Sequence, residues 1–343
     1  MFSGNAKINY LSTLAFDDEV LSQFGAAANS VEIVQITAND AADVPPEVWA
    51  QVDVLHTSSV LPRPEYVPRL QWIQLDTSGV DHVRPHPIWN SSAVLTTIGG
   101  ISPVPLAEYV IWSILGMAHR LPELLEVRDT RQWPSPSERW RRMLPAPLRG
   151  STLVIVGYGR IGREIGRIAD TLGMSVVGVS RTGVAAPEQS DQFFDFAPNT
   201  SQADIELVGT DLLMSVLPRA DYLVIVVPLT AATANLIDAA AVTALKPGAV
   251  VVNVARGGII DEEALRAGLR SGQIAGAVLD VFDDEPLGPE HPWWNEPTVF
   301  VTPHVSGFAP QYSRQVIELV TENLRRFTEG QPLMNVVDRS QGY

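Results

Sequence analysis

A glycine-rich turn between an apolar run and a helix-like segment constrains the fold of this chain more than any other feature. Gly157, Gly159 and Gly162 follow the run Leu153–Val156, and the periodic segment Arg163–Leu172 comes after them. In this setting the first glycine permits a sharp turn, the second lets the backbone approach a pyrophosphate, and the third lets the helix lie close to the strand. We therefore predict a strand, a tight turn and a helix whose first turn binds a dinucleotide.

A series of strand-like runs extends from Ser151 onward. The runs are STLVIVG, MSVVGVS, DYLVIVV, AVVVNVA, IAGAVLDVF and TVFVTP. Helix-like stretches such as Arg163–Leu172 and Glu262–Ser271 border them. This alternation predicts an α/β fold in which the runs form a Rossmann-type, doubly wound parallel sheet.

A second α/β series precedes the first. Its strand-like runs are Lys7–Thr13, Val31–Thr37, Val52–Thr57, Leu70–Asp76 and Ala93–Ile98. Val44–Ala50 and the polar stretch after Phe16 are expected to be helices or turns. The series predicts an open, mostly parallel sheet of a flavodoxin-like domain. With 343 residues, the chain is long enough for two domains.

Three segments outside the strand-like runs carry further expectations. Leu106–Arg120 is too apolar for a surface helix and too short for a membrane span, so we predict a buried helix that joins the domains. Residues 128–149 gather Arg, Trp and Pro, a composition enriched at protein interfaces, and predict an exposed loop or arm. Tyr312–Glu329 predicts an amphipathic helix ended by Gly330, whereas the polar segment Thr182–Gly209 predicts no element.

Net charge and cysteine content exclude several classes of function. The formal net charge of −15 repels phosphate backbones, so we expect no nucleic-acid partner. The absence of cysteine excludes disulfides, thiolate nucleophiles and cysteine-ligated zinc, and we expect no metal. The first residues do not resemble a secretory signal, and no apolar run approaches the roughly 20 residues that span a bilayer. We expect a cytoplasmic protein without a membrane partner.

The end of the strand-like run MSVVGVS indicates which dinucleotide binds. NAD-binding proteins commonly place an acid here to hold the ribose hydroxyls, but this chain has Ser180, Arg181 and Thr182, and the first acid downstream is Glu188. A guanidinium flanked by two hydroxyls suits a 2′-phosphate, because its forked N–H groups match a dianion. A solvated surface arginine is the alternative. We predict that NADP(H) is preferred and that NAD(H) is possible.

An arginine, a glutamate and a histidine follow three further strand-like runs. Arg256 follows AVVVNVA, Asp280 and Glu285 follow the apolar part of IAGAVLDVF, and His304 follows TVFVTP. Ligands bind outside the carboxyl ends of the strands in open α/β sheets. We therefore expect these side chains to converge on the edge that carries the glycine turn.

This set of side chains suits the reduction of a 2-keto acid. His304 would donate a proton to the carbonyl oxygen, and Glu285 would support the imidazole. Arg256 would grip the carboxylate through two parallel hydrogen bonds. Each residue alone would be read as a solvated or structural group, and their conjunction beside a nucleotide turn favours catalysis. The five other histidines are expected to be structural: His56, His82, His86, His119 and His291.

These motifs resemble those of the D-isomer-specific 2-hydroxy acid dehydrogenases, and within them the glyoxylate/hydroxypyruvate reductases. The resemblance covers nearly the whole chain. The matching pieces are VGYGRIG, VPLTAATANLI, VNVARGGIIDEEAL, AVLDVFDDEPL and TPHVSG. The spacing of Arg256, Glu285 and His304 is typical of the family, and the segments SRT and VVDRSQGY resemble its NADPH-using reductase branch.

The resemblance implies roles for individual residues. Arg256, Glu285 and His304 would be catalytic, and Asp280 would hold the nicotinamide carboxamide. Ser78, Gly79 and Val80, together with Arg256, would hold the substrate carboxylate. The cofactor-binding residues would be Gly157, Tyr158, Gly159, Arg160, Ile161, Gly162, Ser180, Arg181, Thr182, Val227, Pro228, Thr233, Val254, Ala255, Asp280, His304 and Gly307.

The resemblance also implies the domain organisation and a partner. Residues 1–101 and 306–343 would form a discontinuous substrate-binding domain, and residues 102–305 would form the NADP-binding domain. A homodimer is expected, with the arm around Trp133 and Trp140 at or near its interface. A tryptophan of the arm could reach the active site of the partner.

Two features depart from the family pattern. The loop reads TSGVD, where many relatives have a small apolar residue before Gly-Val-Asp, and Thr182–Gly209 is longer than usual. Glu285 stands where formate dehydrogenases have Gln, which argues against that activity. The chain stops soon after its last predicted helix, so we expect no regulatory domain of the long phosphoglycerate dehydrogenases.

The sequence therefore predicts NADPH-dependent reduction of a small 2-keto acid, of the glyoxylate or hydroxypyruvate type, to the D-2-hydroxy acid. One alternative is a dehydrogenase for a bulkier acid, of the phenylpyruvate or phosphoglycerate type. The other is a non-catalytic NADPH-sensing binding protein, because corepressors built on this fold keep a similar Arg-Glu-His set.

Overall fold

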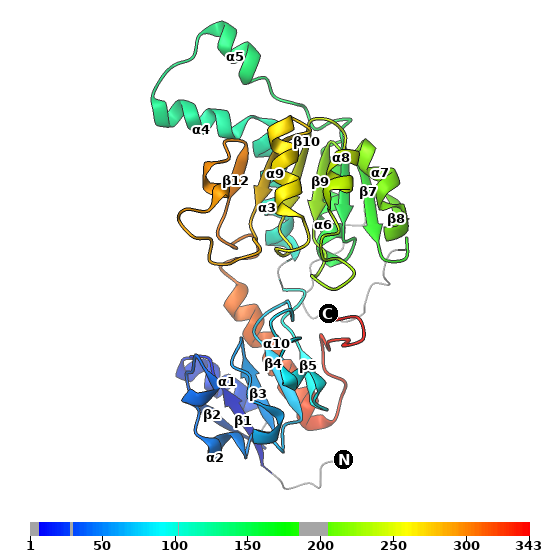
Figure 1. Cartoon of the computed structure of the whole chain (residues 1–343). Coiled ribbons are helices and arrows are strands. Elements are labelled where there is room, and N and C mark those ends of the chain that lie inside the picture. The colour runs from blue at the N-terminus through cyan, green and yellow to red at the C-terminus, as the bar shows by residue number, and fades with distance from the viewer. Residues whose placement is uncertain (1–6, 28–29, 102, 185–204) are drawn as a thin grey trace. The chain divides into compact units, whose positions relative to one another are not determined.

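The protein consists of two compact units. The computed structural model describes residues 7–27, 30–101, 103–184 and 205–343. We call the unit of residues 7–27, 30–101 and 310–343 the N-terminal unit, and that of residues 103–184 and 205–309 the central unit. Each unit has its own sheet (Figure 1). Each also has its own hydrophobic core.

The described residues of the central unit form a seven-stranded sheet in the order β12-β11-β10-β9-β6-β7-β8. All of its paired strands run parallel. The strands are β6 (Thr152–Val156), β7 (Ser175–Ser180), β8 (Glu206–Gly209), β9 (Tyr222–Ile225), β10 (Ala249–Asn253), β11 (Ile274–Leu279) and β12 (Val299–Val301). The direction of winding reverses between β6 and β9, which is the point where such sheets bind ligands. The predicted α/β, Rossmann-type sheet is confirmed.

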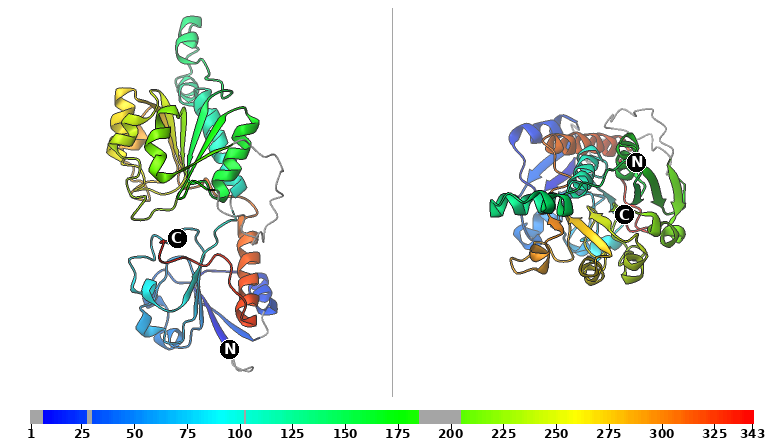
Figure 2. Two further views of the ribbon diagram at one scale, coloured as in Figure 1. Left: turned by 90° about the vertical axis from the view of Figure 1, so that its right-hand side faces the viewer. Right: turned by 90° about the horizontal axis from the view of Figure 1, so that it is seen from above.

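Helices cover both faces of this sheet (Figure 2). They are α3 (Pro103–Ala118), α6 (Arg160–Thr171), α7 (Leu213–Val216), α8 (Ala239–Ala244) and α9 (Glu262–Ser271). Successive residues of a strand point to opposite faces, so Val154 joins the core under α8 and α9, whereas Ile155 joins the core under α3 and α6. The apolar runs of the sequence are apolar throughout because both faces of each strand are covered.

Three segments differ from their predictions. Thr182–Gly209 contains the edge strand β8, and its residues 185–204 lie outside the described part of the chain. The arm is helical, with α4 (Leu121–Thr130) and α5 (Pro136–Arg142), and Ser135 caps α5 by accepting a hydrogen bond from the amide of Glu138. Helix α3 lies wholly in the central unit, and Trp112 is exposed on its surface.

The N-terminal unit is a parallel sheet in the order β2-β1-β3-β4-β5. This order is typical of flavodoxin-like folds. Its strands are β1 (Ile8–Ser12), β2 (Val31–Gln35), β3 (Val54–Thr57), β4 (Trp72–Leu75) and β5 (Val94–Thr96), and its helices are α1 (Asp18–Ala27), α2 (Pro46–Trp49) and α10 (Tyr312–Glu329). Helix α10 ends at Gly330, as predicted, and the chain after it forms an antiparallel bridge from Val336 to Thr96 of β5.

The described residues contain no helix that is both long and apolar enough to cross a bilayer.

Candidate active site

The glycine-rich turn joins β6 to α6 in the central unit. Gly157 has a φ of +109°, and a Cβ on it would lie 2.7 Å from the backbone of Val226, which follows β9. A Cβ on Gly162 would lie 2.2 Å from the carbonyl oxygen of Gly157. A larger residue at either position would therefore push the helix away from the sheet.

Gly159 leaves the space in front of α6 open. It is the N-cap of the helix, no side chain caps the helix, and a Cβ on Gly159 would meet no atom within 4 Å. The amides of the first helical turn lack partners within the helix and attract phosphate groups. The amides of Arg160, Ile161 and Gly162 belong to this turn, so the residues present fit the pyrophosphate of a dinucleotide.

Tyr158 has a different role from the one that its place in the motif suggests. Its side chain is buried in the core, against Gly166 of α6 and Gly178 of β7. A Cβ on Gly178 would lie 2.5 Å from the ring. Burial raises the pKa of the phenol to about 12. Tyr158 therefore stabilises the contact between sheet and helix, and only its backbone remains as a candidate contact for a cofactor.

Other predicted cofactor residues follow β9, which pairs with β6, and β10, which pairs with β9. Val227 and Pro228 come after β9, and Val254 and Ala255 come after β10. The hydroxyl of Thr233 donates to the carbonyl oxygen of Pro228 at 2.6 Å and so holds the turn after β9. Because paired parallel strands end at one edge of a sheet, these residues lie along the edge that carries the glycine turn.

The predicted 2′-phosphate residues lie at the end of β7. Ser180 is the last residue of the strand, and Arg181 and Thr182 are exposed after it. The hydroxyl of Ser180 donates to the carbonyl oxygen of Val184 at 3.0 Å, which closes the turn. Glu188 lies outside the described residues.

His304 and Glu285 form a hydrogen-bonded pair after the neighbouring strands β12 and β11. Nδ1 of His304 lies 2.7 Å from Oε2 of Glu285. Oε1 of Glu285 accepts a hydrogen bond from the amide of Phe282 at 3.0 Å, which orients the carboxylate. The side chain of His304 is 47% exposed. Since Glu285 engages Nδ1, the ring offers Nε2 to a bound molecule.

Asp280 anchors the loop that carries His304. Its buried carboxylate accepts hydrogen bonds from the hydroxyl of Thr302 at 2.6 Å and from the amides of Val305 and Ser306, both at 2.9 Å. The amide of His304 donates to the carbonyl oxygen of Asp280 at 2.9 Å. His304 has a φ of +52°, a conformation that costs roughly 1–2 kcal/mol in a non-glycine residue. The bonds to Asp280 offset that cost. Gly307, a predicted cofactor residue, follows in the same loop.

Tyr109 is a residue of this region that the sequence did not single out. Its hydroxyl lies 2.5 Å from Oγ1 of Thr302, and Thr302 in turn donates to Asp280. Burial raises the pKa of Tyr109. The single hydrogen of the Thr302 hydroxyl goes to Asp280, so the phenol of Tyr109 donates to Thr302. The resulting series of hydrogen bonds runs from Tyr109 on α3 through Thr302 to Asp280. The only local signal was the hydroxyl residue two positions before His304.

Arg256 follows β10 in a loop that packs on the loop of Glu285. A Cβ on Gly257 would lie 2.0 Å from the carbonyl oxygen of Phe282, so nothing larger than glycine fits between the two loops. Nδ2 of Asn253 donates to the carbonyl oxygen of Arg256 at 3.0 Å, and Nη1 of Arg256 donates to the carbonyl oxygen of Ala255 at 2.7 Å. Arg256 thus lies on the edge of the sheet that carries the other two predicted catalytic residues.

The predicted substrate loop belongs to the N-terminal unit. Ser78, Gly79 and Val80 follow β4, and the hydroxyl of Thr77 donates to the carbonyl oxygen of Gly79 at 2.8 Å. The side chain of Val80 is buried in the core, which holds the loop from behind, and Ser78 is exposed. Among the described contacts, none engages the amides of Gly79 and Val80.

Four of the other five histidines contact nearby side chains or backbone groups, and the fifth, His119, is exposed. His56 contacts Tyr10 and Asp76, and the ring of His82 lies 2.8 Å from the carbonyl oxygen of Ser58. His86 and His291 each accept a hydrogen bond from the amide two residues later. His119 is exposed after α3.

The central unit therefore combines a dinucleotide turn, an arginine and a carboxylate-supported imidazole at one edge of a sheet. Such a set moves a proton to or from an oxygen of a bound anion. The chain also matches the model of the family described as D-isomer specific 2-hydroxyacid dehydrogenase, NAD binding domain, over residues 111–306.

Three similar proteins illustrate the relationship. The chain is 33% identical over 255 residues to the (S)-sulfolactate dehydrogenase of Chromohalobacter salexigens, with 74% of each chain covered. It is 26% identical to a D-isomer specific 2-hydroxyacid dehydrogenase of Xanthobacter autotrophicus Py2, solved with NADPH and MES, at a TM-score of 0.78 over 99% of this chain and 100% of the other. For the NADPH-dependent glyoxylate/hydroxypyruvate reductase of Sinorhizobium meliloti, solved with NADP and sulfate, the identity is 25% and the TM-score is 0.77, over 98% of this chain and 100% of that one. The chain belongs to the D-isomer specific 2-hydroxyacid dehydrogenases, a family of NAD(P)-dependent oxidoreductases.

Proposed function

We propose that the protein uses NADPH to reduce a small 2-keto acid, of the glyoxylate or hydroxypyruvate type, to the D-2-hydroxy acid. The observation that carries the proposal is the His304–Glu285 pair, 2.7 Å apart, at the edge of the sheet that holds the glycine turn. The similarity to a glyoxylate/hydroxypyruvate reductase supports the substrate class. Residues 102–305 are the proposed NADP-binding domain, and residues 1–101 and 306–343 the proposed substrate-binding domain.

In the proposed mechanism, the turn at Gly157–Gly162 would hold NADPH, and the cofactor would supply the hydride that C2 of the keto acid accepts. Arg256 binds the carboxylate of the substrate, and the amides of Gly79 and Val80 bind it from the N-terminal unit. Nε2 of His304 gives a proton to the keto oxygen, while Glu285 holds Nδ1 and fixes the orientation of the ring. Asp280 is proposed both to hold the His304 loop and to contact the carboxamide of the cofactor.

Replacement of His304 tests the proposal directly. His304→Ala should lower kcat by on the order of 10²–10⁴ while NADPH still binds, because a positioned acid contributes that much. His119→Ala, at an exposed histidine after α3, is the matched control and should behave as wild type. Near-normal turnover by His304→Ala would remove that residue from the role.

Replacement of Arg181 tests the preference for NADPH. Arg181→Ala should raise the KM for NADPH about tenfold or more, because charged hydrogen bonds contribute about 1.5–3 kcal/mol, and it should leave the KM for NADH nearly unchanged. Arg314→Ala, at an exposed arginine of α10, is the control. An equal rise for both cofactors would rule out recognition of the 2′-phosphate.

Substrate size separates the remaining candidates. The identity to a sulfolactate dehydrogenase favours, as a second candidate, a larger acid with a second anionic group. A panel of glyoxylate, hydroxypyruvate, phenylpyruvate and phosphohydroxypyruvate with both cofactors should give the highest kcat/KM for the first two. Tight NADPH binding without turnover on any of them would instead indicate a sensor.

We propose that α4 and α5 form the interface of a homodimer. Trp133 is 84% exposed and Trp140 is 71% exposed on this arm, which extends beyond the sheet of the central unit (Figures 1 and 2). The double variant Trp133→Ser/Trp140→Ser should convert a dimer into a monomer in light scattering. Tyr66→Ser, at an exposed aromatic residue of the N-terminal unit, should not. The proposed setting is the cytoplasm, which cell fractionation would test.

A further inference from the structure

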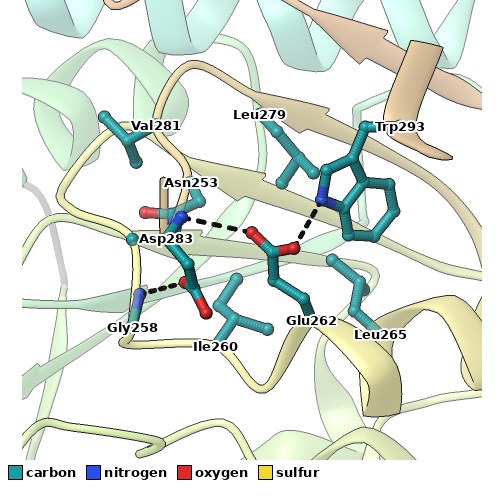
Figure 3. A pocket seen from close by; sticks show the side chains of 10 residues that line it. Asn253, Gly258, Ile260, Glu262, Leu265, Leu279, Val281, Asp283 and Trp293 are labelled. Atoms are coloured by element: carbon teal, nitrogen blue, oxygen red, sulfur yellow. Dashed lines mark hydrogen bonds between the residues drawn. The ribbon is translucent and has the colours of Figure 1, made fainter. Parts of the chain in front are cut away.

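A small pocket with a mixed polar and apolar lining lies behind the loop that carries Arg256. Its lining includes Asn253, Gly258, Glu262, Asp283 and Trp293. In Figure 3 the carboxylate of Glu262 lies at the centre of this group, between Asp283 and the indole ring. None of the predicted catalytic residues lines the pocket, so its polar groups need an explanation of their own.

Hydrogen bonds connect these groups into one chain. Nε1 of Trp293 donates to Oε2 of Glu262 at 2.9 Å, and the amide of Asp283 donates to Oε1 of Glu262 at 3.3 Å. Oδ1 of Asp283 accepts from the amide of Gly258 at 2.6 Å (Figure 3). Trp293 is buried, and Glu262 is the first residue of α9. A buried indole and a rigid helix therefore hold Asp283, which in turn holds the Arg256 loop.

The same turn also orients Glu285. The amide of Phe282 donates to Oε1 of Glu285, and the carbonyl oxygen of Phe282 lies against Gly257 with no room for a Cβ. The contact thus joins Gly257, the residue after Arg256, to Phe282, which lies three residues before Glu285. The turn at Phe282 and Asp283 joins the two catalytic loops through backbone contact and one side-chain hydrogen bond.

We propose that Asp283 is a positioning residue that fixes the guanidinium of Arg256 relative to the Glu285–His304 pair, with Glu262 and Trp293 supporting it from behind. This inference rests on the proposed function, in which Arg256 binds the substrate carboxylate. A displacement of about 1 Å of such a group can lower the rate about 10²-fold. The acceptor on Asp283, rather than its charge, is the required feature, because its partner is a neutral backbone amide.

Two substitutions at Asp283 separate the acceptor from the charge. Asp283→Asn keeps an oxygen at the position of Oδ1, so kcat/KM for the keto acid should stay within about threefold of wild type. Asp283→Leu has a similar size and no acceptor, so kcat/KM should fall about 10–100-fold. The affinity for NADPH, measured by fluorescence titration, should not change in either variant. Equal losses in the two variants, or none in Asp283→Leu, would overturn the proposal.

A double-mutant cycle tests whether Asp283 acts through Arg256. In the Arg256→Gln background, Asp283→Leu should cost less than about threefold, because the guanidinium that it positions is gone. The full 10–100-fold loss in that background would show that Asp283 acts by another route. Trp293→Phe, which removes the indole donor and keeps an aromatic ring, should cost about threefold and provides a second variant if Asp283→Leu does not fold.

Hydrogen exchange separates this inference from the proposed function. The backbone around Gly258 should exchange faster in Asp283→Leu than in wild type, and at the wild-type rate in Asp283→Asn. This readout needs no substrate. If wild type reduces no keto acid but the exchange pattern appears, the proposed function fails and the positioning contact stands. Unchanged exchange in Asp283→Leu would refute the contact itself.

Discussion

Asp280 of the central unit and Asp53 of the N-terminal unit are both buried beside a strand, but they lie at opposite ends of their strands. Asp280 follows β11 and binds the loop of His304 through Thr302, Val305 and Ser306. Asp53 precedes β3 and binds the amide of Asn9 and the guanidinium of Arg69 at 2.9 Å. Parallel sheets bind ligands at the carboxyl ends of their strands, so we expect Asp280 to support the proposed reaction and Asp53 to support only the fold.

The largest expected difference comes from replacing each aspartate by asparagine. Asp280→Asn should lower kcat on the order of 10²-fold, because the amide group opposes one of the donors that hold the His304 loop. Asp53→Asn should lower Tm by several degrees and leave kcat within about twofold. Steady-state kinetics and calorimetry measure both. A loss of kcat in Asp53→Asn as large as that in Asp280→Asn would break the comparison.

Two threonines whose hydroxyls bridge other side chains, one in each unit, give a finer version of the same test. Thr302→Val removes the hydroxyl between Tyr109 and Asp280 and should lower kcat about tenfold. Thr96→Val removes a buried hydroxyl between Trp72 and Gln74 in the N-terminal unit and should change stability only. Tyr109→Phe should have a smaller effect than Thr302→Val, since Thr302 keeps its bond to Asp280. Wild-type kcat in Thr302→Val would contradict a role for the hydrogen bonds between Tyr109, Thr302 and Asp280 in positioning His304.

A smaller effect is expected at the residues that precede the substrate loop. His56 is buried, its Nδ1 lies 2.6 Å from the hydroxyl of Tyr10, and its Nε2 lies 3.5 Å from Oδ1 of Asp76, two residues before Ser78. Burial raises the pKa of Tyr10 well above its ordinary value, so the phenol keeps its hydrogen beside Nδ1 of His56. Among the described residues, neither Nε2 of His56 nor Oδ1 of Asp76 has a hydrogen-bond partner, so their contact is the link to the loop.

We expect His56→Leu to raise the KM for the keto acid about twofold, because it removes the polar contact of 3.5 Å between Nε2 and Oδ1 of Asp76, with kcat and NADPH affinity unchanged. His56→Gln should restore much of the affinity, because its amide can donate near the position of Nε2. A wild-type KM in His56→Leu would show that the loop does not depend on this contact.

The smallest effect concerns the acid stability of the N-terminal unit. Hydrogen bonds from Arg325, and then from Arg326, lower the pKa of Glu322 on α10 from 4.5 to about 2. The carboxylate therefore stabilises the fold above about pH 4.5, and this contribution is lost as the pH falls toward 2. Glu322→Gln should reduce the fall of Tm across that range by an amount that corresponds to about 0.5–1 kcal/mol. Glu318→Gln, whose partner Arg314 is largely exposed, should have no measurable effect.

The sequence predicted the elements whose signals are local. The bounds of α9 and α10 are those expected from their periodicity, Glu262–Ser271 and Tyr312–Glu329. The turn at Gly157–Gly162 was predicted because its spacing reflects steric limits within a few residues. The edge strand β8 was missed because Glu206–Gly209 is short and polar at its start, so only its pairing with β7 reveals it.

The hydrogen bonds that support the candidate site could not be predicted from local signals. Tyr109 and Thr302 are separated by 193 residues, and Trp293 reaches Glu262 over 31 residues. No pattern in either segment marks the other, because these hydrogen bonds form only after the sheet has brought its helices and loops together.

The amino-acid sequence by itself determined most of the strands and helices, the glycine turn and the prediction that Arg256, Glu285 and His304 are catalytic. These follow from hydrophobic periodicity, glycine sterics and the chemistry of single side chains. Only the tertiary structure decided that Glu285 engages Nδ1, that Tyr158 is buried, and that Asp280 and Asp283 bind the loops of His304 and Arg256. The reason is physical: hydrogen-bond direction and burial depend on neighbours that are distant along the chain.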